Sequence, residues 1–149
     1  MNPVYLNLKT MKTIIYSIFL LLSLTACHEV KVGFLETAEA RYKPDVLEVK
    51  KVLDPVEDAD RIARKFNWVS YPIDGVQGTY PMYMKIYAVR TEESGDTAKF
   101  LAETKVRGDG TFDIPFDNEI PAGKYIVTLK VENEGYSAIL TDIFTVWVH

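Results

Sequence analysis

The sequence predicts an all-β protein, an antiparallel β-sandwich of about seven strands. Short segments in which apolar and polar residues alternate at period two are separated by Gly, Pro, Asn and Asp, the usual residues of turns. These turn signals recur at the spacing typical of a sandwich, and the pattern predicts no crossover helices of the kind a parallel sheet needs. With 149 residues, 48% of them hydrophobic, the chain can bury one core of ordinary size.

A lipoprotein signal peptide is expected at residues 1–26. Lys12 precedes an apolar run over 14–24, and small residues follow the run. About 20 apolar residues are needed to cross a bilayer, so the shorter run is typical of a secretory signal that is removed. Met11 begins a better-formed signal than Met1 does.

Cys27 is the only cysteine of the sequence and follows the signal directly. Leu24, Thr25 and Ala26 precede it, and the four residues together resemble the bacterial lipobox. The resemblance implies a diacylglycerol thioether on Cys27, cleavage before it and acylation of the new amino terminus. Because several acyl chains anchor a protein stably, we expect a membrane-anchored protein of the cell envelope, in the outer membrane and facing the surface or the periplasm. The alternative is a buried thiol at the end of a signal anchor.

Residues 27–43 show no sustained period and are expected to form a lipid-anchored tether, with one short strand around 30–35 as the alternative for that part, so that the sandwich domain spans 44–149. The first strand is predicted over 46–53, and Pro55 ends it because proline has no N–H for a β-ladder. Acidic residues early and basic residues late in 56–65 favour a short helix, with a solvated connector as the alternative.

The central strands follow from the alternation. A second strand is predicted over 66–71. In 82–89 the even-numbered residues form one face, and Tyr83, Lys85, Tyr87 and Val89 form the other. A hairpin turn at 94–96 then leads to predicted strands over 100–106 and 111–115, and the last strands are expected at 124–131, 136–140 and 143–148.

The segment 120–146, IPAGKYIVTLKVENEGYSAILTDIFTV, is similar to the final strands of bacterial immunoglobulin-like domains of the PKD and fibronectin III kind. The resemblance implies that Tyr125 forms a tyrosine corner, with its ring in the core and its hydroxyl on a nearby backbone group. The Trp-Asp-Phe-Gly-Asp signature of PKD domains is missing. Together with the lipobox, the pattern resembles the small surface lipoproteins of Bacteroidota.

The charge balance bears on the partners. Without residues 1–26 the chain has 15 Lys and Arg against 21 Asp and Glu, a net charge of −6. An acidic chain without a basic stripe argues against nucleic acid as a partner, because that affinity comes largely from Lys and Arg at phosphates. It argues equally against electrostatic attraction to anionic lipid.

Residues with catalytic or metal-binding chemistry are few. His28 lies beside the expected anchor and His149 is the last residue, which argues against a histidine-based triad or a zinc site. No spacing among the acidic residues stands out. We expect no enzyme activity, no cofactor and no metal.

Two motifs near one predicted hairpin have a turn interpretation that we favour. Oxygen side chains that calcium could use occur at Asp109, Asp113, Asp117, Asn118 and Glu119, yet Asp-Gly and Asp-Asn are also ordinary turn residues. Residues 107–109 spell Arg-Gly-Asp, the integrin-binding tripeptide, which also occurs by chance.

Two candidate glycan-related sites remain. Asp96-Thr97-Ala98 resembles the O-glycosylation signal of exported Bacteroidota proteins, with Thr97 expected on an exposed loop. Trp68, Tyr83 and Tyr87 could form an aromatic platform for a sugar, although core packing is the favoured interpretation, above all for Trp68.

The function expected from these observations is that of a binding or assembly module, with a glycan or another envelope protein as partner. The first alternative is an accessory glycan-binding lipoprotein that uses Trp68, Tyr83 and Tyr87. The second is a structural subunit that associates by β-strand addition at an exposed sheet edge.

Overall fold

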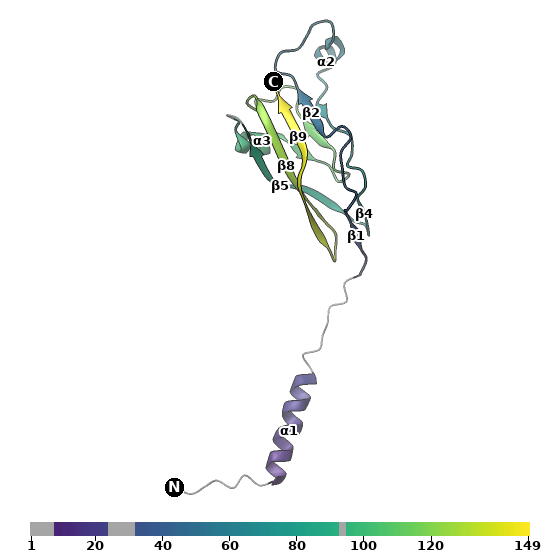
Figure 1. Ribbon diagram of the computed structural model, residues 1–149, viewed down its shortest axis with the longest axis vertical. Helices are drawn as coiled ribbons and strands as arrows, with labels where there is room; N and C mark the ends of the chain where they lie inside the picture. Colours follow the sequence, from purple (N-terminus) through teal and green to yellow (C-terminus); the bar gives the residue numbers. More distant parts are fainter. Residues whose placement is uncertain (1–7, 24–31, 93–94) are drawn as a thin grey trace, which may run out of the picture. The chain divides into compact units, whose positions relative to one another are not determined.

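The computed structural model describes residues 8–23, 32–92 and 95–149, and the side chains of the first helix only over 11–18. The chain divides into two compact units, Met1–Lys31 and Val32–His149 (Figure 1). Within the first unit, α1 spans Leu8–Ser23. Among the described residues, no helix has both the length and the apolar character needed to cross a membrane. The predicted lipobox, 24–27, and His28 lie outside the described residues.

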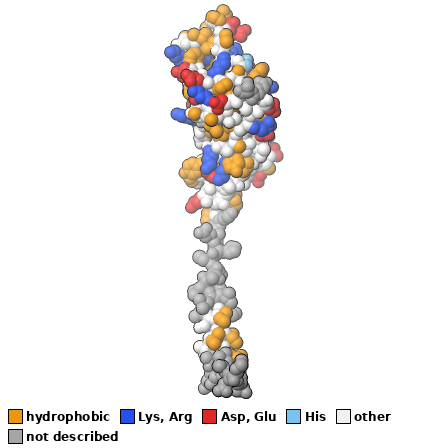
Figure 2. Space-filling model, turned by 90° about the vertical axis from the view of Figure 1, so that its left-hand side faces the viewer, with side chains coloured by type: hydrophobic (Ala, Val, Ile, Leu, Met, Phe, Trp, Pro, Cys, Tyr) orange, Lys and Arg blue, Asp and Glu red, His pale blue; other side chains and the backbone are white. Residues whose placement is uncertain are grey.

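In its described residues, 32–92 and 95–149, the second unit is rich in strands and contains two short helices. Its elements are, in chain order, β1 (Leu35–Glu36), β2 (Val46–Val49), α2 (Ala59–Arg64), β3 (Trp68–Val69), β4 (Gln77–Gly78), β5 (Tyr83–Thr91), α3 (Thr97–Glu103), β6 (Lys105–Val106), β7 (Phe112–Ile114), β8 (Gly123–Glu132) and β9 (Ser137–Val148). This list of elements confirms the prediction of a β-rich chain. On the face that Figure 2 presents, acidic and basic side chains are interspersed.

The strands form three open sheets. A four-stranded sheet has the order β2-β9-β8-β5, a three-stranded sheet has the order β3-β7-β6, and β1 pairs with β4. All pairs are antiparallel except β2 with β9, which are parallel, with Val46 opposite Thr145. The expectation of a purely antiparallel arrangement is corrected at this edge.

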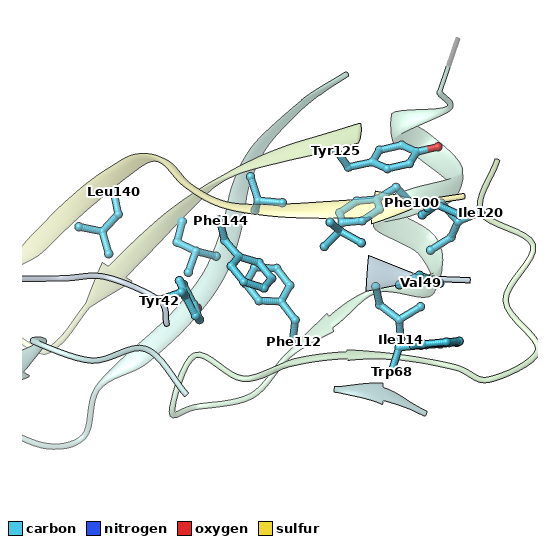
Figure 3. Packing of buried hydrophobic residues seen from close by; sticks show 14 of the residues in the cluster. Tyr42, Val49, Trp68, Phe100, Phe112, Ile114, Ile120, Tyr125, Leu140 and Phe144 are labelled. Atoms are coloured by element: carbon cyan, nitrogen blue, oxygen red, sulfur yellow. The ribbon is translucent and has the colours of Figure 1, made fainter. Parts of the chain in front are cut away.

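The four-stranded and three-stranded sheets contribute to one hydrophobic core. On β8, Tyr125, Val127, Leu129 and Val131 are all fully buried, as the alternation predicted. From the three-stranded sheet, Phe112 stacks on Phe144 of β9 with ring centroids 4.6 Å apart. Figure 3 shows these two rings at the middle of the buried cluster. The contact between the two sheets is thus made by large aromatic side chains.

The folded unit begins earlier than predicted. Residues 32–43 were expected to be part of a tether, yet β1 lies within them and Tyr42 is buried in the core. The Tyr42 hydroxyl donates a 2.6 Å hydrogen bond to the carbonyl oxygen of Gly110. Arg41 and Asp74 also exchange backbone hydrogen bonds. The domain therefore starts at Val32 and not at residue 44.

The prediction of a strand over 100–106 is wrong for its first half. Residues 97–103 form α3, because the Asp96 side chain accepts a 3.0 Å hydrogen bond from the Lys99 N–H and so caps the helix. Phe100 is the buried residue of this helix. The other predicted helix is confirmed in part, since α2 covers 59–64 of the expected 56–65.

Two irregularities change which residues share a face. In β5 the register with β8 shifts between Ile86 and Ala88, which leaves Tyr87 as an extra residue. Val89 then packs against the core, and the predicted face assignment beyond Tyr87 is wrong. The predicted strands 136–140 and 143–148 form one strand, β9, with a backbone irregularity at Asp142, where φ is 50°.

Candidate binding face on the four-stranded sheet

The surface of the four-stranded sheet that points away from the core carries exposed tyrosines together with charged side chains. We call it the outer face. Tyr83 and Tyr87 of β5 are 60% and 62% exposed there. The outer face includes Tyr83, Lys85, Tyr87 and Arg90 of β5, Lys130 and Glu132 of β8, and Ile139 and Asp142 of β9.

Glu132 joins two lysines on the outer face. Its Oε1 lies 2.6 Å from the Nζ of Lys85, and its Oε2 lies 2.6 Å from the Nζ of Lys130. The hydrogen bonds from Lys130 and Lys85 lower the pKa of the Glu132 carboxyl from 4.5 to about 2. The carboxylate is therefore ionised at neutral pH and neutralises one of its two cationic partners.

A second ion pair connects the edge strand β5 with β9. The Nη2 of Arg90 lies 2.9 Å from Oδ2 of Asp142, and its Nε lies 3.2 Å from the same oxygen. The Asp142 backbone N–H donates to Oγ1 of Thr128 on the intervening strand. Arg90 lowers the pKa of the Asp142 carboxyl, and Asp142 raises the pKa of the Arg90 guanidinium. The irregularity in β9 thus positions a carboxylate for an arginine two strands away.

The strand register places apolar side chains around these charges. Tyr83 is paired with Glu132, and Glu132 with Ser137, in one row across β5, β8 and β9. Two residues further along β5, Lys85 is paired with Lys130, and Lys130 with Ile139, which is 45% exposed. Because most of these charges are paired within the sheet, the tyrosine rings and Ile139 are the groups in these rows that are available for contact with another molecule.

Trp68 does not share the surface of the two tyrosines. It belongs to β3 of the three-stranded sheet, where it pairs with Ile114, and its side chain is buried in the core (Figure 3). The guanidinium of Arg61 lies 3.8 Å from the centroid of its ring. The structure therefore brings together two of the three predicted platform residues, and Trp68 takes the core position that the sequence favoured.

Thr97 lies in a different setting from the expected loop. It is the first residue of α3 and is half buried. Its neighbour Asp96 is occupied as the helix cap. The Asp-Thr-Ala motif thus marks the beginning of a helix in this chain.

The acidic residues near the β6–β7 hairpin serve the local structure. Asp113 accepts hydrogen bonds from Arg107 and from Asn67, and Asp109 accepts one from the backbone N–H of Thr111. These bonds lower the pKa of both carboxyl groups. Within the part of the chain that is described, no group of three or more His, Cys, Asp and Glu side chains is arranged to hold a metal.

The arginine and the aspartate of the Arg-Gly-Asp tripeptide are used inside the hairpin. Arg107 pairs with Asp113, and the Asp109 side chain caps its own turn.

At the C-terminus, His149 stacks on Trp147 with ring centroids 4.3 Å apart, and its Nε2 lies 3.8 Å from a carboxylate oxygen of Glu48.

The sequence interpretation missed Lys130, Glu132 and Ile139 as members of a surface. Lys130 and Glu132 alternate with the buried residues of β8, so their position on the side away from the core could have been predicted from the period of two. Their contact with Lys85 depends on the register between β5 and β8, which alternation alone does not specify.

Comparison with protein-family models, with curated proteins and with solved structures gave no match.

Proposed function

We propose that this chain is a non-enzymatic, lipid-anchored protein of the cell envelope, in which an immunoglobulin-like sandwich domain serves as a binding or assembly module. The observation that carries the binding role is the exposure of Tyr83 and Tyr87 on the outer face, beside charges that are paired within the sheet. Aromatic rings on a flat sheet surface supply contact area at low entropic cost.

The strand order supports an immunoglobulin-like fold. In that fold the strands B, E and D form one sheet, and C, F and G the other. If β3 is strand B and β5 to β9 are strands C to G, the two sheets of this domain have the orders B-E-D and G-F-C. β2, which runs parallel to β9, is then an additional strand at the G edge.

Tyr125 supports the same assignment. It lies near the start of β8, the strand that corresponds to F, and its hydroxyl donates a 2.8 Å hydrogen bond to the carbonyl oxygen of Pro121. A tyrosine that bonds back to the chain at this place is the tyrosine corner of immunoglobulin-like domains.

The anchor is supported by the sequence. The apolar run over 14–24, followed by Leu24-Thr25-Ala26-Cys27, has the form of a lipoprotein signal, and the folded domain begins shortly after it, at Val32. Lipid on Cys27 would hold the domain at the outer membrane. A Cys27→Ser variant is then expected to leave the membrane fraction, and retention of the variant in that fraction would contradict the anchor.

The nature of the partner can be tested on the outer face. Detergent-solubilised full-length protein is applied to an array of bacterial and host glycans, as wild type and as the double variant Tyr83→Ala with Tyr87→Ala. Tyr71→Ala is the matched control, because Tyr71 is equally exposed but lies outside the outer face. Glycan binding lost only in the double variant supports a glycan partner. Binding that survives in the double variant would contradict a role for this face.

A protein partner is the other candidate, and the edge of the sheet favours one form of it. β5 is nine residues long and lies at the end of the four-stranded sheet, next to β8. A strand at the edge of a sheet can accept a strand from another chain, although the bulge at Tyr87 interrupts β5. Association through β5 predicts a dimer or larger assembly in size-exclusion chromatography with light scattering. A monomer at all concentrations would contradict self-association by strand addition.

A further inference from the structure

The folded domain begins very close to the cysteine that is expected to carry lipid. Val32 follows Cys27 by five positions. Because an extended chain covers at most about 3.6 Å per residue, the two Cα atoms cannot be more than about 18 Å apart in any conformation. A tether through residue 43 would have permitted about 60 Å by the same relation. The start of the domain is therefore confined to the neighbourhood of the membrane surface if Cys27 is lipidated.

The first residues of the domain are fastened to its body. The Phe34 N–H donates to Oγ1 of Thr79, and the Thr79 N–H donates to the carbonyl oxygen of Phe34. The side-chain amide of Asn133, in the turn between β8 and β9, donates a 2.9 Å hydrogen bond to that same carbonyl oxygen. One end of the domain is thus formed by β1, β4 and the β8–β9 turn, and these elements lie together in Figure 1. We call this the proximal end.

The proximal end exposes large apolar side chains. Phe34 is 55% exposed and Tyr80, next to Thr79, is 80% exposed. Val32 is also exposed. Figure 2 shows hydrophobic side chains at this end of the domain and also at the opposite end. Tyrosine and other amphipathic or aromatic side chains are favoured at the headgroup level of a bilayer, where the ring meets apolar groups and the hydroxyl stays hydrated.

The opposite end of the domain is separated from the proximal end by the length of β9. β9 has twelve residues, which extend over about 36 Å at 3.3 Å per residue. The N–H of Lys51 donates to the carbonyl oxygen of His149, just beyond β9, so Val52 lies at that distal end. Val52 is 86% exposed there and provides an internal reference.

We propose that the domain docks with its proximal end on the phospholipid headgroup layer, with the rings of Phe34 and Tyr80 at the membrane interface. This proposal rests on the lipidation of Cys27 in the proposed function. The contact depends on the aromatic rings and not on charge, because the acidic residues Glu36 and Glu134 lie at the same end. The docking fixes the orientation of the domain and directs the Val52 end away from the bilayer.

The test uses full-length lipidated protein reconstituted into phosphatidylcholine vesicles that contain a lipid with a nitroxide quencher near the headgroup. Lipidation consumes the thiol of Cys27, so an introduced cysteine is labelled uniquely. A bimane label is placed at the proximal end by Glu134→Cys, and at the distal end by Val52→Cys. The proposal predicts strong quenching of the first label and little quenching of the second.

The dependence on the rings separates docking from mere closeness to the anchor. Phe34→Ser with Tyr80→Ser, added to Glu134→Cys, is expected to remove most of the quenching, whereas the control Val56→Ser leaves it unchanged. Val56 is more exposed than either ring but belongs to the loop before α2. The melting temperature of each variant checks that the fold is retained. Equal quenching at the two ends, or quenching that the serine substitutions leave unaltered, would overturn the docking. A chain without acyl groups in intact mass spectrometry would refute the proposed function itself, and the docking with it.

Discussion

The hydroxyl of Tyr125 donates a 2.8 Å hydrogen bond to the carbonyl oxygen of Pro121 and accepts a 3.2 Å hydrogen bond from the N–H of Asp96. Its ring stacks on Phe100 with centroids 4.7 Å apart. One side chain thus ties the start of β8 to the loop before it and to the start of α3. Removal of the hydroxyl leaves the N–H of Asp96 and the carbonyl oxygen of Pro121 without this partner.

Tyr125→Phe is therefore expected to lower the free energy of unfolding by about 1–2 kcal/mol, the cost of losing partly buried hydrogen bonds without changing the packing. Urea denaturation followed by fluorescence measures this. Tyr83→Phe is the matched control, because the Tyr83 hydroxyl is on the exposed outer face. A loss of equal size in both variants would contradict the role assigned to Tyr125.

The helix cap at Asp96 gives a second test. Asp96→Ala is expected to destabilise the domain by about 0.5–2 kcal/mol, because the N–H of Lys99 loses its acceptor, whereas Asp96→Asn keeps most of the stability. Hydrogen exchange of the amides in 97–103 should accelerate in the alanine variant. Protection of these amides that is identical in both variants would argue that the segment is not a capped helix.

The stacked pair of Phe112 and Phe144 gives a third test. Both rings are buried and come from different sheets. Phe112→Ala should cost about 3–5 kcal/mol through lost contacts and the cavity left behind, and Phe112→Leu should cost less than half as much. Chemical denaturation of the two variants checks the order. Equal costs would mean that the two sheets do not meet at this residue.

Glu132 predicts how stability depends on pH. Its pKa is about 2 in the folded chain and about 4.5 ordinarily, so the carboxylate favours the folded state above pH 4.5. This contribution is lost as the pH falls from about 4.5 to about 2, because over this range the unfolded chain takes up a proton at Glu132 while the two lysines keep the carboxylate of the folded chain ionised.

The expected result is a urea midpoint that falls across this pH range by less in Glu132→Gln than in the wild type. Glu134→Gln is the control, since it removes the same charge at the exposed turn that follows β8. An acid dependence that is the same in Glu132→Gln and in the wild type would contradict the ion pairs with Lys85 and Lys130.

Much of the β-structure could be predicted from the sequence because alternation reports directly on which side of a sheet a residue lies. β8 is the clearest case: its four predicted inward residues are all buried. The helix at 97–103 was missed because Phe100 and Ala102 also fit a period of two over so short a segment. Asp96 fits a hairpin turn as well as a helix cap, because both structures use the same residue type.

The limits of the domain and the composition of the outer face depend on contacts between distant residues. Tyr42 belongs to the core because its hydroxyl reaches Gly110, 68 positions away. No local pattern in residues 32–43 predicts that Tyr42 belongs to the core. Tyr83, Lys85 and Glu132 meet through the register of β5 and β8, and the bulge at Tyr87 changes the face of every later residue in β5. Such features follow from tertiary pairing and not from local periodicity.

The most direct test of the account is the intact mass of the protein extracted from bacterial membranes. The account predicts a chain that starts at Cys27 and is heavier than its sequence by a diacylglycerol group, with one further acyl chain where the host acylates the amino terminus. A chain that still contains the residues before Cys27, with that thiol unmodified, would contradict the anchored function.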